Sequence, residues 1–255
     1  MENADSLDGW QVVVSGGSGA LGAAVVASFV ERGASVTVLD RFAPKPFSAR
    51  ERVHAMQVDL TDERAVTAAF AGLRRLDASI HCAGGFDMKA IAETSLADLD
   101  AMWRMNAASC FLACREAVRA MRRTREMQAR DARAGGRSKA APAEATPGAA
   151  PQGWIVNVAA RPALQPAGGM LAYSMSKAAV ANLTQSLAAE VLAEGILVNA
   201  IVPSIMDTPA NRRAMPTADH SKWPRVEEVA RVIRALASPS NRTTSGALVP
   251  VYGAA

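Results

Sequence analysis

The chain has 255 residues, of which 50% are apolar and 20% are charged, and its formal net charge is +4 at pH 7. It has no uninterrupted apolar stretch near the roughly 20 residues that a helix needs to cross a bilayer. The acidic start, with Glu2, Asp5 and Asp8, is unlike the basic start of a secretory signal. We therefore expect a cytoplasmic protein without a membrane partner, long enough to bury a large core in one domain.

Short apolar strands alternate with helical segments along the whole chain. Strands are predicted over residues 10–14, 35–39, 53–58, 78–82, 154–158, 197–202 and 247–251. Helices are predicted from the glycine cluster through Phe29, and over residues 63–73, 96–105, 108–130, 172–193 and 226–237. A strand that returns parallel to its neighbour needs a crossover, usually a helix. The order therefore predicts an α/β fold with a mostly parallel sheet, helices on both faces and ligands at the carboxyl ends of the strands.

The positive charge belongs to one segment. Residues 115–139 include nine basic and three acidic residues, whereas the rest of the chain has 19 basic and 21 acidic residues. The body is therefore nearly neutral, and we expect no nucleic-acid partner. The segment starts as a helix and passes into an Ala-, Gly- and Pro-rich stretch, so residues 124–152 are predicted to be an exposed, mobile insertion within a single domain of residues 1–255. A contact with a partner, an anionic surface or another subunit is the alternative.

A glycine-rich turn follows the first predicted strand. It consists of Ser15, Gly16, Gly17, Ser18, Gly19, Ala20, Leu21 and Gly22. Glycines between a strand and a helix let backbone N–H groups approach a pyrophosphate at the positive end of the helix. Asp40 ends the second strand 18 residues beyond Gly22, close to the spacing of about 20 residues expected of a ribose-binding acid. This spacing favours NADH, while the neighbouring Arg41 could pair with a 2′-phosphate and leaves NADPH open.

Tyr173 and Lys177 are four residues apart in a predicted helix, so one helical turn places them on the same face. Tyrosine is a weak acid, but an adjacent cation favours the phenolate and lowers the pKa of the phenol. The pair is therefore a candidate proton donor with a group that tunes it. Because structural helices carry the same spacing, the glycine turn is what favours the catalytic interpretation.

These motifs resemble the short-chain dehydrogenase/reductase family over nearly the whole chain. The resemblance implies a Rossmann fold, doubly wound, with a nicotinamide cofactor and hydride transfer. It implies that Tyr173 handles the proton, Lys177 binds the nicotinamide ribose and Asn106 supports a proton-relay water. It also implies cofactor contacts from the glycine turn and from Asp59, Leu60, Ala83, Gly84, Pro203 and Thr208. Bridging of local backbone groups is the structural alternative for Asn106.

Three positions depart from the family pattern. Ala160 stands where the family has a serine that polarises a carbonyl, Ala20 replaces the middle glycine, and Cys82 replaces the Asn before Ala-Gly. Loss of one preorganised donor to an oxyanion typically costs about 2.7 to 4 kcal/mol. We therefore expect ordinary ketone reduction to be disfavoured.

With these departures, the chain resembles the dihydropteridine reductase branch of the family, whose substrate is a quinonoid dihydropterin. The resemblance is carried by residues 16–22 and 83–85 and by the segment from Asp207 to Trp223, which includes Asn211. It implies hydride transfer from NADH, and we predict that Phe86, Ala160 and Asn211 line the substrate site, with Phe86 stacking on the pterin ring. The alternative for Phe86 is that it packs on the core. The chain departs from the branch at Asn106, at Phe86-Asp87 and in the insertion.

Two other functions stay open at this point. One is a reductase or dehydrogenase acting on another activated carbonyl, and the other is a non-catalytic dinucleotide-sensing protein.

Family members commonly pair through the helices that correspond to residues 108–123 and 172–193, which implies a homodimer or homotetramer. The three cysteines, Cys82, Cys110 and Cys114, have no close His or Cys partners at metal-ligand spacing and are predicted to be small buried side chains without a metal.

Overall fold

Seven parallel strands form the central sheet in a computed structural model that describes residues 6–42, 50–134 and 150–254. They lie in the order β3-β2-β1-β4-β5-β6-β7. Their bounds are β1 (Gln11–Ser15), β2 (Ser35–Asp40), β3 (Val53–Gln57), β4 (Ala78–His81), β5 (Gly153–Val158), β6 (Ile196–Pro203) and β7 (Leu248–Val251). The predicted α/β fold is confirmed, and each strand begins and ends within two residues of its predicted position.

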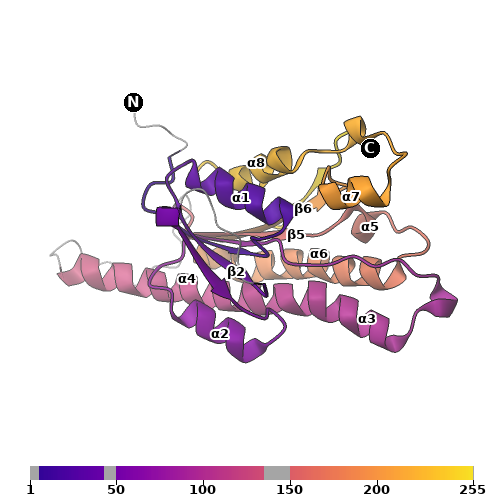
Figure 1. The fold of residues 1–255 in the computed structure, drawn as a ribbon. Helices are drawn as coiled ribbons and strands as arrows, with labels where there is room; N and C mark the ends of the chain where they lie inside the picture. The colour runs from indigo at the N-terminus through magenta and orange to yellow at the C-terminus, as the bar shows by residue number, and fades with distance from the viewer. Residues whose placement is uncertain (1–5, 43–49, 135–149, 255) are drawn as a thin grey trace.

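Helices cover both faces of the sheet (Figure 1). They are α1 (Ala20–Val30), α2 (Glu63–Ala71), α3 (Leu96–Met102), α4 (Ser109–Ala134), α5 (Arg161–Leu164), α6 (Leu171–Val191), α7 (Pro209–Ala214) and α8 (Val226–Leu236). One face carries α1 and α8, and the other carries α2, α4 and α6. A π-helical turn, η3 (Trp103–Ala108), joins α3 to α4, and this turn and the short helices α5 and α7 were not predicted.

The sheet separates two apolar cores. Val14 of β1 packs with Phe29 of α1 and Ile233 of α8 on one face, and all three are fully buried. On the other face Phe70 of α2 packs with residues of α4 and β5, including Ile155. Strands buried on both faces read as continuous apolar runs, which is why their positions could be predicted closely.

The chain changes direction across the sheet between β1 and β4. Because β1 lies between β2 and β4, the loops that follow β1 and β4 diverge to opposite faces and leave a crevice at the carboxyl ends of the strands. The two loops touch at Gly16, which has a φ of +70°, and a Cβ there would lie 2.6 Å from the Ala83 backbone nitrogen. Only glycine suits this position, both for its backbone conformation and for its space.

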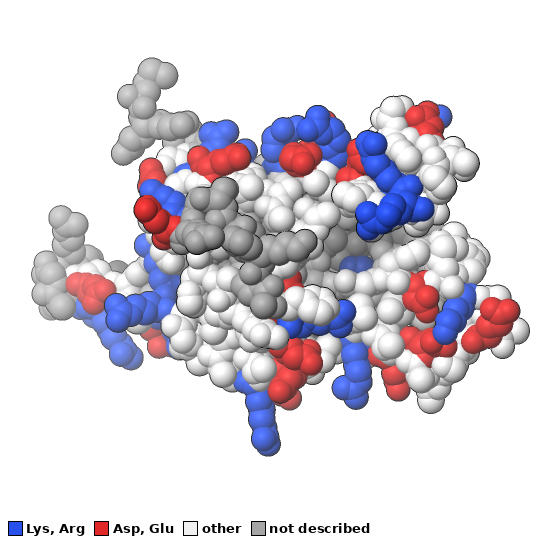
Figure 2. Space-filling view, in the orientation of Figure 1, with Lys and Arg blue, Asp and Glu red and all other residues white. Residues whose placement is uncertain are grey.

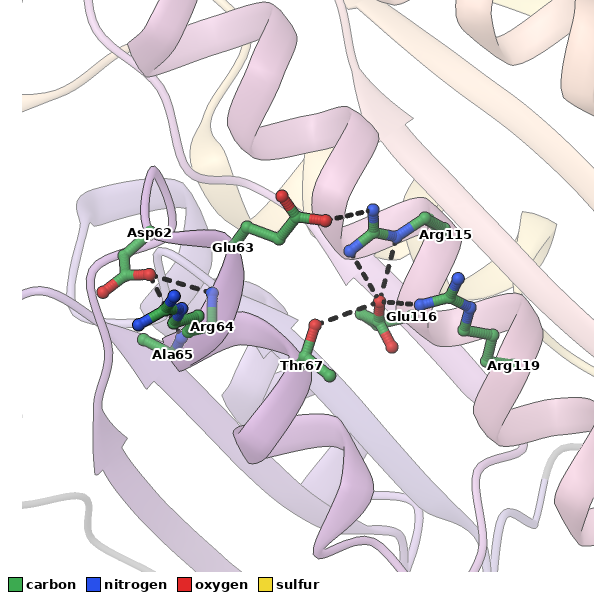
Figure 3. Close-up of polar contacts among 8 residues, drawn as sticks. All are labelled: Asp62, Glu63, Arg64, Ala65, Thr67, Arg115, Glu116 and Arg119. Carbon is green, nitrogen blue, oxygen red and sulfur yellow. Dashed lines mark hydrogen bonds and ion pairs between the residues drawn. The ribbon is translucent and has the colours of Figure 1, made fainter.

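A buried carboxylate joins α2 to α4 (Figure 3). Glu116 is 2% exposed, and its Oε1 accepts hydrogen bonds from Arg115 Nε at 2.9 Å, Arg119 Nη1 at 2.8 Å and Thr67 Oγ1 at 3.3 Å. Arg115 also donates to Glu63 of α2 at 2.6 Å. Several of the basic residues that give the chain its positive charge therefore hold the fold together and are not a free basic surface.

The predicted insertion begins inside the fold. Its helical part is the end of α4, where Thr124 is buried and its Oγ1 accepts a hydrogen bond from Leu76 N at 3.0 Å. The following residues, 135–149, lie outside the described residues. On the face drawn in Figure 2, basic and acidic side chains are mixed and do not gather into one basic patch. No helix in the described parts of the chain has the length and apolar character of a membrane span.

Candidate active site

The glycine turn makes a backbone cradle in front of α1. Gly17 packs on β2, because a Cβ on it would lie 2.7 Å from Val38 Cγ1. Gly19 is the N-cap residue of α1 and provides no side-chain cap, so N–H groups of the first turn stay available to a ligand. The Ser18 hydroxyl oxygen is buried and has no hydrogen-bond partner among the described residues. An unpartnered hydroxyl beside a helix N-terminus, in a turn without bulky side chains, suits the phosphate and ribose oxygens of a dinucleotide.

Asp40 is fixed beside this cradle at the end of β2. Its side chain is buried, Oδ2 accepts a hydrogen bond from Ser18 N at 3.0 Å, and Oδ1 accepts one from Phe42 N at 3.2 Å. The Arg41 guanidinium carbon lies 4.7 Å from the centre of the exposed Phe42 ring. The carboxylate is therefore held where an adenosine ribose would approach the turn, with a cation and an aromatic ring next to it.

The other residues predicted to bind the cofactor also follow the carboxyl ends of strands or begin the next helix. Asp59 lies beyond β3, where hydrogen bonds from the Thr61 backbone and hydroxyl lower the pKa of its carboxyl group. Pro203 ends β6, and Thr208 caps α7. The remaining members of the set are Ala20, Leu21, Gly22, Leu60, Ala83 and Gly84. One edge of the sheet thus collects all of these positions.

Tyr173 and Lys177 lie on the first two turns of α6. Lys177 is 5% exposed, and its Nζ donates a hydrogen bond to the carbonyl oxygen of Val158, the last residue of β5, at 2.8 Å. A Cβ on Gly84 would lie 3.2 Å from the same Nζ. The ammonium therefore reaches from α6 to the carboxyl ends of β4 and β5, while Tyr173 stays half-buried at the edge of the crevice.

The acid–base properties of the pair differ from the sequence expectation. Burial raises the pKa of Tyr173 to about 12, and burial also lowers the pKa of Lys177 to about 8. The expected lowering of the Tyr173 pKa by Lys177 is not found in this structure, because desolvation of the phenol dominates and the ammonium donates to Val158. The phenol consequently stays protonated at neutral pH, as a proton donor must.

Asn106 connects the loop after β4 to α6 from within the π-helical turn. Its Oδ1 accepts a hydrogen bond from Gly85 N at 2.9 Å, and its Nδ2 donates to Gly85 O at 3.1 Å and to Ser176 Oγ at 2.9 Å. Ser176 Oγ in turn donates to Tyr173 O at 2.8 Å. The Asn106 side chain therefore bridges the two elements that carry the candidate site, and its contact with the Gly85 backbone is of the kind that the structural alternative expected. π-helical turns occur frequently at functional sites.

The predicted substrate residues differ in their surroundings. The Phe86 ring lies 4.9 Å from the Tyr173 ring at an interplanar angle of 84° and is 58% exposed. Ala160 is 4% exposed and offers no hydroxyl at the start of α5. Asn211 Nδ2 donates to Met206 O at 2.8 Å, which ties this amide to the loop before α7. Phe86 is therefore brought against Tyr173, whereas the Asn211 amide is used within its own loop.

Sequence reasoning missed the roles of three groups at this site. Ser176 fixes Asn106 to α6, and its only signal in the sequence is its position directly before Lys177. The Ser18 hydroxyl was available as the one polar side chain between the glycines, but its burial became apparent only with the fold. The Val158 carbonyl group, which accepts the hydrogen bond from Lys177, had no signal in the sequence, because every strand ends in a backbone carbonyl group.

Comparisons with known proteins agree with this arrangement. A short chain dehydrogenase family model matches residues 11–129, and an enoyl-(acyl carrier protein) reductase model matches residues 138–253. Cis-4-hydroxycyclohexanecarboxylate dehydrogenase of Sinomonas cyclohexanicum is 32% identical, covering 94% of this chain and 94% of the relative. Galactitol 2-dehydrogenase of Rhizobium johnstonii is 31% identical and covers 96% and 94%. The structure of a mutant short-chain dehydrogenase/reductase from Serratia marcescens has a TM-score of 0.78 and 27% identity, and covers 97% and 98%.

The fold and the site define an NAD(P)-dependent oxidoreductase with a small-molecule substrate. A dinucleotide cradle at the switch point of a parallel sheet faces a buried lysine and a protonated tyrosine. The chain belongs to the short-chain dehydrogenase/reductase family. Because these two curated relatives are dehydrogenases of different substrates, the comparisons identify the family and not a branch within it.

Proposed function

We propose that the protein is an NADH-dependent reductase of an electron-poor ring compound, resembling dihydropteridine reductase, with quinonoid dihydropterin as the first candidate substrate. The observation that supports this proposal most directly is Ala160. It is a buried alanine at the position where the family has the carbonyl-polarising hydroxyl, in a chain that keeps Tyr173 and Lys177. An acceptor that gains stabilisation when it is reduced needs less help from such a hydroxyl. The missing donor would lower the rate with an ordinary ketone by a factor of roughly 100 to 1,000.

The proposed chemistry divides between the cofactor and α6. When bound, the dihydronicotinamide supplies a hydride, which carries both electrons. Tyr173 supplies the proton, so that one hydride and one proton convert the dihydropterin into a tetrahydropterin. The pKa of the phenol, raised by burial to about 12, keeps it protonated until the acceptor becomes basic. Lys177 holds a positive charge at neutral pH that would stabilise the phenolate left behind and bind the ribose.

An apolar, partly aromatic rim supports a flat ring as the substrate. Phe86 and Tyr173 meet edge to face, and Phe86 keeps more than half of its surface exposed. Met88 is also exposed, and a Cβ on Gly169 would lie 3.8 Å from Met88 Cε, so the loop after β4 reaches the segment before α6. The exposed face of Phe86 would stack on the ring and hold it over the proton donor.

A preference for NADH follows from Asp40. Its carboxylate is fixed by two backbone N–H groups and lies at the predicted ribose site, where its charge would repel a 2′-phosphate. Among the described residues beside Asp40, Arg41 is the cation that favours NADPH, but its guanidinium group lies over the Phe42 ring. We therefore propose NADH as the preferred cofactor, with NADPH accepted less well.

A second candidate function is oxidoreduction of a cyclic alcohol and its ketone. The observation that favours it is the 32% identity, over 94% of the chain, with a cis-4-hydroxycyclohexanecarboxylate dehydrogenase. In that case a water molecule must replace the absent hydroxyl, because both N–H bonds of Asn106 Nδ2 already donate to Gly85 O and Ser176 Oγ. The intact Tyr173 and Lys177 pair disfavours the third possibility, a non-catalytic dinucleotide sensor.

The test of the proposed function follows NADH absorbance with chemically generated quinonoid dihydropterin and, separately, with a panel of cyclic ketones. Fast oxidation with the pterin and slow oxidation with the ketones would support the proposal. Fast oxidation with a ketone alone would replace it by the second candidate, and cofactor binding without turnover on any substrate would support the sensor.

We further propose a homodimer, or a homotetramer built from it, that pairs through α4 and α6 in the manner the family resemblance implies. Phe111 of α4 is 49% exposed and Met175 of α6 is 45% exposed, which leaves apolar surface on both helices. Light scattering of the purified chain should give at least twice the monomer mass, and the variant Phe111→Asp should reduce it. A monomeric wild-type chain would contradict the proposed assembly.

A further inference from the structure

Three metal-ligating side chains meet in the core on the face of the sheet covered by α4 and α6. His81 ends β4, while Cys110 and Cys114 are one turn apart on the inner side of α4. Their donor atoms all lie within 4.8 Å of one another, and Cys114 Sγ is 3.4 Å from His81 Nδ1. All three are nearly completely buried. Ligands at positions i and i+4 of one helix with a third from another element is an arrangement that metal sites use.

Asn157 completes a set of four donors. The register of the sheet pairs it with His81 across β4 and β5, and its Oδ1 lies 2.8 Å from His81 Nδ1 and 3.4 Å from Cys114 Sγ. Around tetrahedral zinc, with Zn–N near 2.0–2.1 Å and Zn–S near 2.3 Å, neighbouring donors lie about 3.3–3.8 Å apart. His81 Nδ1 and Asn157 Oδ1 would move apart by about half an ångström. Cys110 Sγ, which lies within 4.8 Å of the other two ligand atoms of the cluster, would move toward them by up to about 1 Å.

Other buried side chains already orient the two ligands from the strands. Ser79 Oγ lies 2.9 Å from His81 Nε2, the ring nitrogen opposite the proposed ligand atom. Asn157 Nδ2 donates to Thr184 Oγ1 at 2.9 Å, which leaves the amide oxygen directed toward Cys114. Partners that fix the far side of a ligand are a regular part of metal sites and set the tautomer of a ligating histidine.

We propose that His81, Cys110, Cys114 and Asn157 form a buried site for zinc or a similar soft divalent cation. Binding releases the two thiol protons to solvent, and the two thiolates cancel the charge of the ion, so no net charge is buried. Thiolate and imidazole donors select zinc over magnesium or calcium. The ion joins α4 to β4 and β5 directly after the turn that carries Asn106, so it stabilises the framework of the candidate active site.

Burial of the donors determines how the metal enters. An ion can reach the site while the chain folds or when the π-helical turn η3 next to Cys110 opens locally. Loading should therefore be slow in the folded protein and complete after refolding with metal.

The test uses a tag-free full-length chain, refolded with zinc or cobalt and freed of unbound metal. Elemental analysis should find one zinc ion per chain. The cobalt form should show a thiolate-to-cobalt charge-transfer band and the intense visible absorption of a tetrahedral site. Zinc should raise the melting temperature of the wild-type chain.

Matched cysteine variants assign the ligands. Cys110→Ser and Cys114→Ser should each weaken zinc binding by more than about 100-fold, beyond the loss expected for a group that only orients a ligand. Cys82→Ser is the control, because Cys82 packs on the opposite face of the sheet, and it should bind zinc as the wild type does.

Three results would overturn the site. A wild-type chain that holds less than stoichiometric zinc after refolding, or whose cobalt form lacks the thiolate band, would leave only a hydrogen-bonded core. Equal zinc binding by the wild type, Cys110→Ser and Cys114→Ser would show that the cysteines are not ligands. If the serine variants do not fold, the cobalt spectrum of the wild type decides alone.

Discussion

Replacement of Lys177 by methionine should make the protein more stable while it removes activity. Burial lowers the pKa of Lys177 from 10.5 to about 8, and each pKa unit corresponds to about 1.36 kcal/mol, so the buried charge costs about 3 kcal/mol at pH 7. The variant loses the hydrogen bond to Val158, which contributes about 1 kcal/mol. We expect Lys177→Met to raise the free energy of unfolding by about 2 kcal/mol, from the difference of these two effects.

The pH dependence of this gain has a definite sign. Below pH 8 the lysine is protonated in the folded and the unfolded chain, so the full cost of burying the charge is present. Between about pH 8 and 10.5 only the unfolded chain keeps the proton, and the stability of the wild type rises with pH. The advantage of the variant should therefore be constant below pH 8 and shrink between pH 8 and 10.5.

The assay is urea unfolding of both chains between pH 7 and 10, in metal-free buffer without cofactor. Lys222→Met serves as the control, because Lys222 is an exposed residue whose solvent-screened ion pair with Asp219 should contribute little to stability. A Lys177→Met chain that is less stable than the wild type at pH 7 would refute the reasoning. So would a stability difference that does not change with pH.

Three further substitutions test the roles of single residues. Tyr173→Phe should lower kcat by about 100-fold to 10,000-fold, because it removes the proton donor, while the Kd for NADH, measured by fluorescence titration, stays close to the wild-type value. Ala160→Ser should leave pterin reduction unchanged but raise kcat/KM for cyclic ketones, by up to roughly 100-fold to 1,000-fold if the new hydroxyl reaches the carbonyl; a larger gain with pterin than with ketones would contradict the role given to Ala160. Asp40→Ser should shift the ratio of the Kd values toward NADPH, and an unchanged ratio would show that Arg41, or another group, selects the cofactor.

The sheet could be predicted from the sequence because its strands are short apolar runs separated by helices. β5 begins one residue before its predicted start, and β6 extends one residue beyond the prediction at each end, since turn residues bound these runs closely. The helices α5 and α7, with four and six residues, are too short to give a helical period. The π-helical turn also had no signal, because its Trp-Arg-Met-Asn-Ala-Ala sequence contains neither proline nor glycine.

The candidate site was predictable where spacing determines position. Tyr173 and Lys177 share a helix, so the sequence places them on one face, but it does not reveal that the lysine donates to β5 and that burial controls both pKa values. The buried group of His81, Cys110 and Cys114 illustrates the opposite case. It combines a strand end with a helix far along the chain, and no local spacing connects them.

The central claim is that Tyr173 gives a proton to an acceptor that needs no polarising hydroxyl. The most direct measurement is the single-turnover rate of NADH oxidation by quinonoid dihydropterin in the wild type and in Tyr173→Phe, with both chains saturated with NADH. We predict rapid oxidation by the wild type and a rate at least about 100-fold lower in the variant. Equal rates in the two chains, or no oxidation by the wild type, would contradict the account.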